Sequence, residues 1–347
     1  MNASATMRNA YVRASVINAY PPIGLLPIRE IESRPINPEK LRDFKKVDHL
    51  QHRETCEKER MDDIGKHIEI IQTAGSEGNQ SFMEFDNDDK DTVGARIRKM
   101  FTRFPYRDPI YLVAVIFALG SLDLVIDGLF DLMPRVLPES KFETQDTIAI
   151  PTTVLIGSVF FFVAGIFDVF GALNADNGTI ESSREDLGPV KYKPALVGSP
   201  EFKWIPSKIK FLDLLTTNLA FQAGLIVLFG GVIFMFAGVV DFPGLVSEES
   251  PSFPLIVLGP QIVHGFLFWI ANVMLTLSEQ EKWYIPKIRD PCWQGAFLNA
   301  TGGFWFMISG FLALQKDELA AAAAELTGSV AFLVGSVGRW YVVMQYC

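Results

Sequence analysis

Three aspartates recur at every fourth residue of one apolar segment: Asp123, Asp127 and Asp131. A spacing of four places side chains on one face of a helix. Carboxyl groups inside a membrane helix are costly, and by default they mark a functional path or a polar contact between helices. A second apolar segment contains His264, and imidazole is the side chain that most readily changes charge near neutral pH. This pairing of acid and imidazole suits a relay for protons or small cations.

Two amides fall at a depth similar to that of Asp123 and His264. The candidate intramembrane polar pathway comprises Asp123, Asp127, Gln222, Gln261 and His264. Asp127 and Asp131 are expected nearest to the outer surface, as a solvated mouth. The alternative is that Asp123 and His264 form a buried, hydrogen-bonded clamp that orients helices and carries nothing.

Asp168 and Arg339 occupy similar predicted depths nearer the opposite surface. They are a candidate ion pair. The alternative is that both side chains extend to the membrane interface, as long charged side chains do near helix ends.

The residues offer no constellation for enzymatic chemistry. No apolar segment holds histidines and a glutamate at metal-binding spacing, and no glycine-rich loop precedes Lys-Ser or Lys-Thr. The three cysteines are unpatterned, and the net charge of −9 does not suit a nucleic-acid binder. We therefore predict a non-enzymatic protein with no catalytic residue, no cofactor, no metal and no nucleic-acid partner.

These polar residues lie in six apolar segments, each about 20 residues long or slightly longer, which is the length that crosses a hydrocarbon core of roughly 30 Å. The sequence therefore predicts an all-α, polytopic membrane protein whose spans are approximately 109–132, 149–173, 211–240, 254–277, 293–315 and 326–346.

Each segment carries a small residue followed seven positions later by another small or polar residue. The pairs are Ser121/Gly128, Ser158/Gly165, Gly231/Gly238, Gly265/Asn272, Gly303/Gly310 and Ser329/Ser336. Small residues let membrane helices approach closely. The pattern predicts a packed bundle built from three hairpin repeats. The alternative is that the segments resemble one another only because glycine, serine and phenylalanine are common in membrane helices. These faces also suggest assembly with further copies of the chain. The fourth span departs from the pattern at Asn272 and holds His264.

Basic residues alternate in number between successive loops. Five basic residues, at positions 96–107, directly precede the first span, and together with every second loop they make 14 lysines and arginines, against 3 in the other loops. By the positive-inside rule both termini are cytosolic. The sequons at Asn79 and Asn177 should then be unmodified. No retention or peroxisomal signal selects an organelle, so the plasma membrane and the endomembranes both remain open.

Residues 1–108 differ from the rest of the chain, with equal numbers of basic and acidic residues. We expect a cytosolic, largely disordered arm with a charged helix around 38–73. The alternative is a docking or regulatory arm.

Three strings resemble a family of uncharacterised multi-pass integral membrane proteins of filamentous fungi. They are Phe104-Pro105-Tyr106-Arg107-Asp108-Pro109-Ile110-Tyr111-Leu112-Val113, Lys282-Trp283-Tyr284-Ile285-Pro286 and Gly328-Ser329-Val330-Ala331-Phe332-Leu333-Val334-Gly335-Ser336. The last string is also similar to the Gly-Ser hairpin of YrhK-like membrane domains. The fungal resemblance covers about residues 95–345. It implies a multi-pass architecture and a fungal source, and it implies no activity or site residue.

Two function classes follow from the sequence. The first is a non-enzymatic structural or accessory protein whose partners are the lipid bilayer and further copies of itself. The alternative is a small proton- or cation-coupled transporter or channel that uses Asp123 and His264, with a substrate that the sequence does not name. A water-filled cavity that reaches Asp123 would favour transport, whereas a dry, closely packed centre would favour the structural role.

Overall fold

The computed structural model describes residues 3–8, 11, 92–181, 191–247, 250–280 and 282–344. All but Lys191 belong to one compact unit. Most of the expected disordered arm, including the charged helix at 38–73 and the sequon at Asn79, lies outside the described residues. Within that arm, residues 3–8 are helical and their backbone is packed against the long helices, which differs from the disorder expected there.

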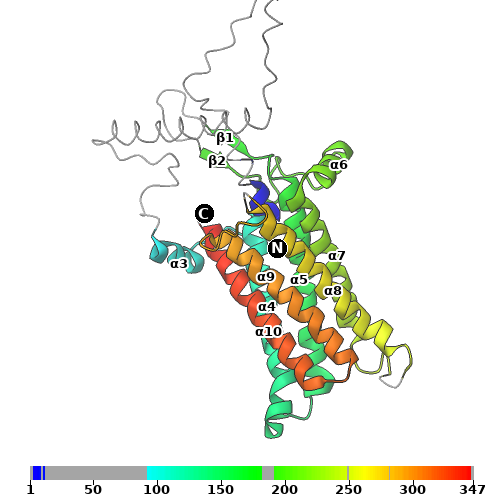
Figure 1. Ribbon diagram of the computed structural model, residues 1–347. Coiled ribbons are helices and arrows are strands. Elements are labelled where there is room, and N and C mark those ends of the chain that lie inside the picture. Colours follow the sequence, from blue (N-terminus) through cyan, green and yellow to red (C-terminus); the bar gives the residue numbers. More distant parts are fainter. Residues whose placement is uncertain are drawn as a thin grey trace, which may run out of the picture. The chain divides into compact units, whose positions relative to one another are not determined.

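Six long helices make up most of the described part of the chain, and the all-α class is confirmed (Figure 1). Each is long and apolar enough to cross a membrane, which supports a membrane location. They are α4 (Pro109–Val136), α5 (Ile150–Leu173), α7 (Leu219–Val240), α8 (Gly259–Ser278), α9 (Pro291–Leu314) and α10 (Glu318–Val343).

Short elements connect the long helices. They are α3 (Val93–Thr102), the 3-10 turn η2 (Pro138–Ser140), the π-helical turns η3 (Gln145–Ala149) and η4 (Pro254–Leu258), strands β1 (Thr179–Glu181) and β2 (Lys191–Lys193), and α6 (Lys208–Thr217). The strands β1 and β2 pair with each other.

Two predicted span boundaries were wrong, because capping residues begin α7 and α10 at positions that differ from the ends of the apolar segments. The expected span 211–240 is divided at Asn218, whose side chain accepts a hydrogen bond from the Phe221 amide and so begins α7. The last span begins at Glu318 and not at 326, because Asp317 caps an alanine-rich first turn.

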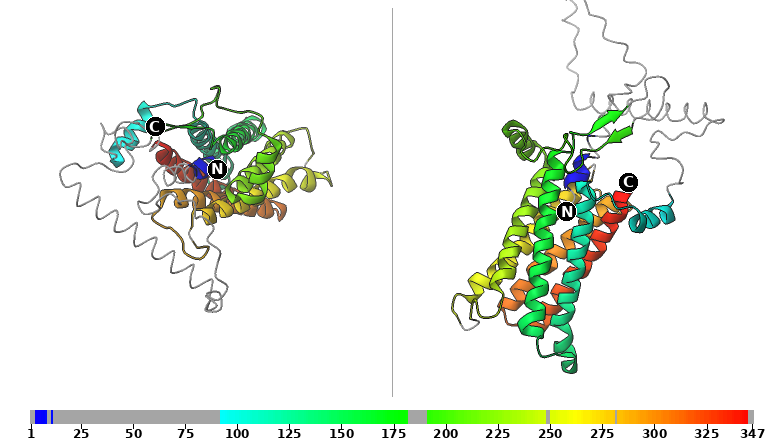
Figure 2. Two further views of the ribbon diagram at one scale, coloured as in Figure 1. Left: turned by 90° about the horizontal axis from the view of Figure 1, so that it is seen from above. Right: turned by 180° about the vertical axis from the view of Figure 1, so that it is seen from behind.

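The six helices form a closed ring. Each packs against its neighbours in sequence, and α10 packs against α4 (Figure 2). Segment 3–8 and Met344 lie at the end of the ring where α4 begins, here called the terminal side. The loops before α5, α8 and α10 lie at the opposite end, here called the distal side.

The helices α4, α7 and α9 start in the same way. Each begins after an Asp or Asn whose side chain accepts a hydrogen bond from the first turn. This N-cap lies thirteen residues before the first small residue of its helix: Asp108 before Ser121, Asn218 before Gly231 and Asp290 before Gly303. The equal offset indicates that these three helices are equivalent first members of three hairpins.

Three phenylalanines meet at the centre of the ring. Phe161, Phe268 and Phe332 come from α5, α8 and α10, and each lies three residues after the first small residue of its helix. Their ring centroids are 5.5, 5.5 and 6.0 Å apart, and all three rings are buried. These residues, here called the phenylalanine triangle, fill the middle of the bundle with aromatic contacts.

The first helix of each hairpin makes room for the triangle with a glycine. A Cβ atom built at Gly120, Gly230 or Gly302 would lie within 3.0 Å of Phe161, Phe268 or Phe332, respectively. Each glycine directly precedes the first small residue of its helix. The hairpins α4–α5, α7–α8 and α9–α10 therefore close through the same contact.

The interfaces between hairpins also repeat. A Cβ atom at Gly128, Gly238 or Gly310 would lie no more than 3.4 Å from the Cα atom of Leu326, Leu155 or Ile262. Each of these contacted residues lies three positions before the first small residue of its own helix. The serines at the remaining small positions donate to carbonyls within their own helices, so they pack as small apolar residues. Three equivalent hairpins thus build the ring.

Gly165 is a packing position on the second helix of its hairpin, and its contact is close, as predicted. A Cβ atom built there would lie 3.2 Å from the Cα atom of Leu228 in α7, which is farther than the nearest atom at any other glycine of the predicted pairs. Leu228 lies three positions before Gly231, so the contact still follows the rule of the other interfaces. The equivalent positions hold Asn272 and Ser336, which carry side chains. Gly165 is therefore a close contact of the interface between α5 and α7, although the equivalent positions of the other hairpins carry a side chain.

This packing predicts that a single methyl group at a close contact destabilises the bundle. In Gly303→Ala the new Cβ would lie 2.5 Å from the Trp269 backbone nitrogen, so α8 and α9 must separate. We expect a loss of about 1–3 kcal/mol, which is typical of overpacking, measured as a lower thermal unfolding midpoint in detergent. Gly338→Ala in α10 is the matched control, because no atom lies within 4 Å of its Cβ position. Equal midpoints for the two variants would contradict this account.

Candidate cation-binding cavity

A cavity of about 140 Å³ lies on the distal side of the phenylalanine triangle. Residues from all six helices line it, and the volume is enough for several water molecules. Its polar lining comprises chiefly Asp127, Asp131, Asp241, Gln261, His264 and Glu325. None of the described residues that line it is a lysine or an arginine. The cavity is therefore suited to a positively charged occupant.

The deepest carboxyl groups in this cavity come from α4 and α10. Asp127 is only 1% exposed, and Thr153 Oγ1 donates to its Oδ1 across 2.6 Å. Its carboxyl group is also within hydrogen-bond reach of Glu325. Two bare carboxylates in contact repel strongly, so a proton or a cation must lie between them. The pair can therefore bind and release positive charge.

The repeat shows that packing does not require these acids. Glu325 lies four residues before the first small residue of its helix, and the equivalent positions of the other hairpins hold Val154 and Gln261. All three line the cavity. Asp127 is likewise equivalent to Ala237 and Ser309. Acidic residues are thus concentrated where α4 meets α10, at positions that apolar or neutral residues fill elsewhere in the ring.

His264 is a second departure from the repeat. The equivalent positions of the other hairpins are Gly157 and Gly328. The imidazole lines the cavity and stacks on Phe234, with ring centroids 4.2 Å apart and planes at 14°. Its Nδ1 lies 3.3 Å from the Pro260 carbonyl oxygen, which accepts the proton of that nitrogen. This assigns the proton to Nδ1 and leaves Nε2 as a lone-pair acceptor.

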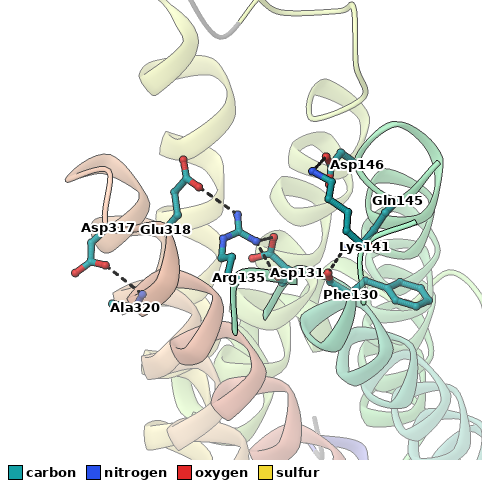
Figure 3. Close-up of polar contacts among 9 residues, drawn as sticks. All are labelled: Phe130, Asp131, Arg135, Lys141, Gln145, Asp146, Asp317, Glu318 and Ala320. Atoms are coloured by element: carbon teal, nitrogen blue, oxygen red, sulfur yellow. Dashed lines mark hydrogen bonds and ion pairs between the residues drawn. The ribbon is translucent and has the colours of Figure 1, made fainter. Parts of the chain in front are cut away.

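Ion pairs lie at the distal ends of α4 and α10 (Figure 3), where Asp131 also lines the cavity. The Arg135 guanidinium donates to Asp131 of its own helix and lies 3.7 Å from Glu318 of α10. Lys141 and Asp146 form a second pair nearby. The Arg135 guanidinium thus balances the charge of Asp131, whereas Asp127 and Glu325 lie deeper in the cavity.

The predicted polar pathway is only partly assembled. Asp127, Gln261 and His264 come together in the cavity, but Asp123 does not line it. Asp123 lies beside Gly157 of α5, and the backbone of Gly157 is the polar neighbour of its carboxyl group. Asp127 was expected at a solvated mouth, and it is instead buried.

The predicted place of Gln222 was wrong. Its Nε2 donates to the Leu215 carbonyl on the terminal side, across 2.8 Å. The reason is that α7 begins at Leu219, so Gln222 is in its first turn and not at mid-depth.

The structure gives Asp168 a different partner from the predicted Arg339. Asp168 is fully buried and accepts hydrogen bonds from the backbone nitrogens of Ala3 and Ser4 and from the Ser4 hydroxyl. Arg339 packs over α9, where a Cβ atom at Gly295 would lie 2.6 Å from its Nε. The two residues nevertheless occupy equivalent positions, ten residues after Ser158 and Ser329.

Sequence analysis missed Glu325, because the last span was expected to begin at 326. Aligning Ser329 with Gly265 would have placed Glu325 at the position of Gln261, inside a helix. It also missed Asp241, which lies directly after α7 and looked like a loop residue.

No family model matches this chain, and no curated protein or solved structure matches it. Among the described residues, no group of three or more His, Cys, Asp or Glu side chains is arranged to hold a metal ion. The resemblance to fungal membrane proteins stays a prediction.

The repeat predicts that neutralising the cavity acids preserves the fold. Glu325→Gln introduces the residue of the equivalent Gln261 position, and Asp127→Asn keeps an acceptor for Thr153. Each variant also removes the repulsion between two carboxyl groups. We expect thermal unfolding midpoints equal to or above that of the parent protein. A fall of more than about 4 °C, on the order of 1 kcal/mol or more for a chain of this size, would instead mean that the acids hold the bundle together.

Proposed function

We propose that this chain is a non-enzymatic membrane protein that binds a proton or a small cation in the distal cavity and acts as a small proton- or cation-coupled transporter. The observation that carries the proposal is the contact between the buried carboxyl group of Asp127 and the carboxyl group of Glu325, a half-buried residue. The pair requires a positive charge between its members and lies in a cavity with room for that charge.

The residue pattern around the pair supports the same function. Charge at the centre of a membrane bundle is costly, and the other two hairpins manage without it. His264 adds an acceptor at a position where its equivalents are glycines. Acid and imidazole together can pass a proton or share a cation.

The second candidate is the structural or accessory role. It is favoured by the phenylalanine triangle and its glycine contacts, which fill the centre of the ring. It is also favoured by the extent of the cavity, which does not reach Asp123. Under this reading the acidic cavity ends at the triangle, and the protein stabilises a membrane assembly, including one with further copies of itself.

Uptake by proteoliposomes distinguishes the two candidates. A pH-sensitive dye inside the vesicles reports proton movement, and sodium or potassium gradients test the cation requirement. We expect uptake by the parent protein and a loss of at least about tenfold in Asp127→Asn and Glu325→Gln, because each removes an ionisable ligand that interacts strongly with the charge. His264→Ala should reduce uptake less, since it leaves both carboxyl groups.

Two carboxylates in the same region provide matched controls. Asp146→Asn removes a charge outside the cavity lining, and Asp123→Asn removes the next aspartate of the same helix face. Both should retain most of the uptake. Uptake that is absent from the parent protein, or unaffected by Asp127→Asn, would leave the structural role as the better account.

We also propose that both termini face the cytosol. The terminal side holds the basic residues of α3, of the segment around α6 and of the loop before α9, while the distal loops hold only Arg135, Lys141 and Lys316. An excess of lysine and arginine is typical of cytosolic loops.

Glycosylation mapping tests this orientation. The native sequon at Asn177 follows α5 on the terminal side and should stay unmodified in a eukaryotic host. A sequon introduced into the distal loop after α7, near Gly244, should acquire a glycan. A glycan on Asn177, detected as a mass shift that a glycosidase removes, would reverse the proposed topology.

A further inference from the structure

Segment 3–8 is inserted into the terminal side of the ring (Figure 2). Ala3 is fully buried and Ser4 is 1% exposed. Glycines on two helices make room for them: a Cβ atom at Gly224 would lie 2.8 Å from the Ala3 Cβ, and one at Gly171 would lie 2.8 Å from the Ser4 Cβ. The ring is thus shaped around the segment.

Carboxyl groups of the bundle hold the segment in place. The carboxyl group of Asp168 in α5 accepts hydrogen bonds from the backbone N–H groups of Ala3 and Ser4 and from the Ser4 hydroxyl, at 2.7–3.2 Å. Arg8 donates two hydrogen bonds to Asp108, the N-cap of α4, at 2.7 and 2.8 Å. Thr6 donates to Glu279 at the end of α8. In every one of these contacts the segment donates the hydrogen bond and a carboxyl group of the bundle accepts it.

Two buried amides lie at depths along the ring axis between that of the phenylalanine triangle and that of Asp168. Asn272 follows Phe268 by four residues, about 6 Å along the helix, and Asp168 follows the equivalent Phe161 by seven, about 10 Å. Asn299 lies against α10, where a Cβ atom at Gly335 would be 2.5 Å from its Oδ1. Oδ1 of Asn272 and both amide atoms of Asn299 are buried without a hydrogen-bond partner among the described residues. Such orphaned groups are rare and indicate a missing ligand or water.

We propose that the terminal half of the ring holds a second cation-binding site, with Asp168 as its charged ligand and the amide oxygens of Asn272 and Asn299 as neutral ligands. Carboxylate and amide oxygens are the ligands that hard cations take. Segment 3–8 occupies the charged part of this site, and its N–H groups stand where the cation binds. The inference rests on the proposed function, since it places a second site for the same class of ion on the other side of the triangle.

The segment and the cation must then compete. Withdrawal of the segment would leave Asp168 buried without its three donors, which is unfavourable unless another positive group arrives. Binding of a small monovalent cation therefore weakens the docking of the segment, and docking weakens cation binding by the same factor.

Thiol labelling measures this competition without measuring transport. The native cysteines are replaced by serine, and Ser4→Cys is labelled with a hydrophilic maleimide in detergent, in the chloride salt of sodium, potassium or N-methylglucamine. The buried thiol should react slowly in the bulky organic cation. It should react faster in sodium or potassium, by about tenfold if the cation replaces hydrogen bonds to a charged group.

Variants of Asp168 test whether this residue is responsible for the competition between the segment and the cation. Asp168→Ala should label quickly in all three salts, and the isosteric Asp168→Asn should lose the dependence on the cation while retaining part of the protection. Glu279→Gln is the control, because it alters the Thr6 contact and leaves Asp168 intact. Equal labelling of the parent in the three salts would overturn the second site. Cation-dependent labelling by a protein that shows no uptake in vesicles would retain the site and overturn only the transport function.

Discussion

The contact between an aromatic ring and a glycine holds this structure together. Lipid removes the hydrophobic drive for helix association, so membrane helices stay together through close packing and polar contacts. Phe161, Phe268 and Phe332 fill the axis of the ring, and the facing helix backbones approach them only where Gly120, Gly230 and Gly302 lack a side chain. Because this contact occurs once in each hairpin, it fixes the depth of all six helices relative to one another.

Because the depth of the helices is fixed, residues at equivalent positions of the three hairpins can be compared directly. A residue that differs from both of its equivalents is not required by the common packing. Glu325, Asp127 and His264 are such residues, and all three line the same cavity. Asp168 is another, since its equivalents are Leu275 and Arg339. The polar residues that differ from their equivalents therefore cluster in two places, one on each side of the phenylalanine triangle.

The sequence predicted the helices and their close packing because both depend on local composition. Apolar runs of sufficient length and small residues seven apart can be read without knowing the neighbours of any helix. The candidate site was harder to predict, because it depends on axial depth. Eight residues of error at the start of α7 moved Gln222 by almost half the thickness of a bilayer core, and a similar error hid Glu325. The role of segment 3–8 could not be predicted, since its short, polar sequence gains order only from carboxyl groups far away in the chain.

The two polar regions impose a condition on any transport by this ring. An ion that crosses the phenylalanine triangle must leave its ligands for an aromatic layer with no polar partner, which is prohibitive without movement. The hairpins close through a few glycine contacts, so a small shift of one hairpin against the next can open the layer while the hairpins themselves stay intact. The segment on the terminal side touches α4, α5, α7 and α8. It therefore bridges the hairpins α4–α5 and α7–α8, and its Ala5 lies in the same buried cluster as Val343 of α10. Its docking holds these hairpins in one relative position. A cation that displaces the segment would release that constraint, and in this way binding on the terminal side can be linked to movement around the triangle.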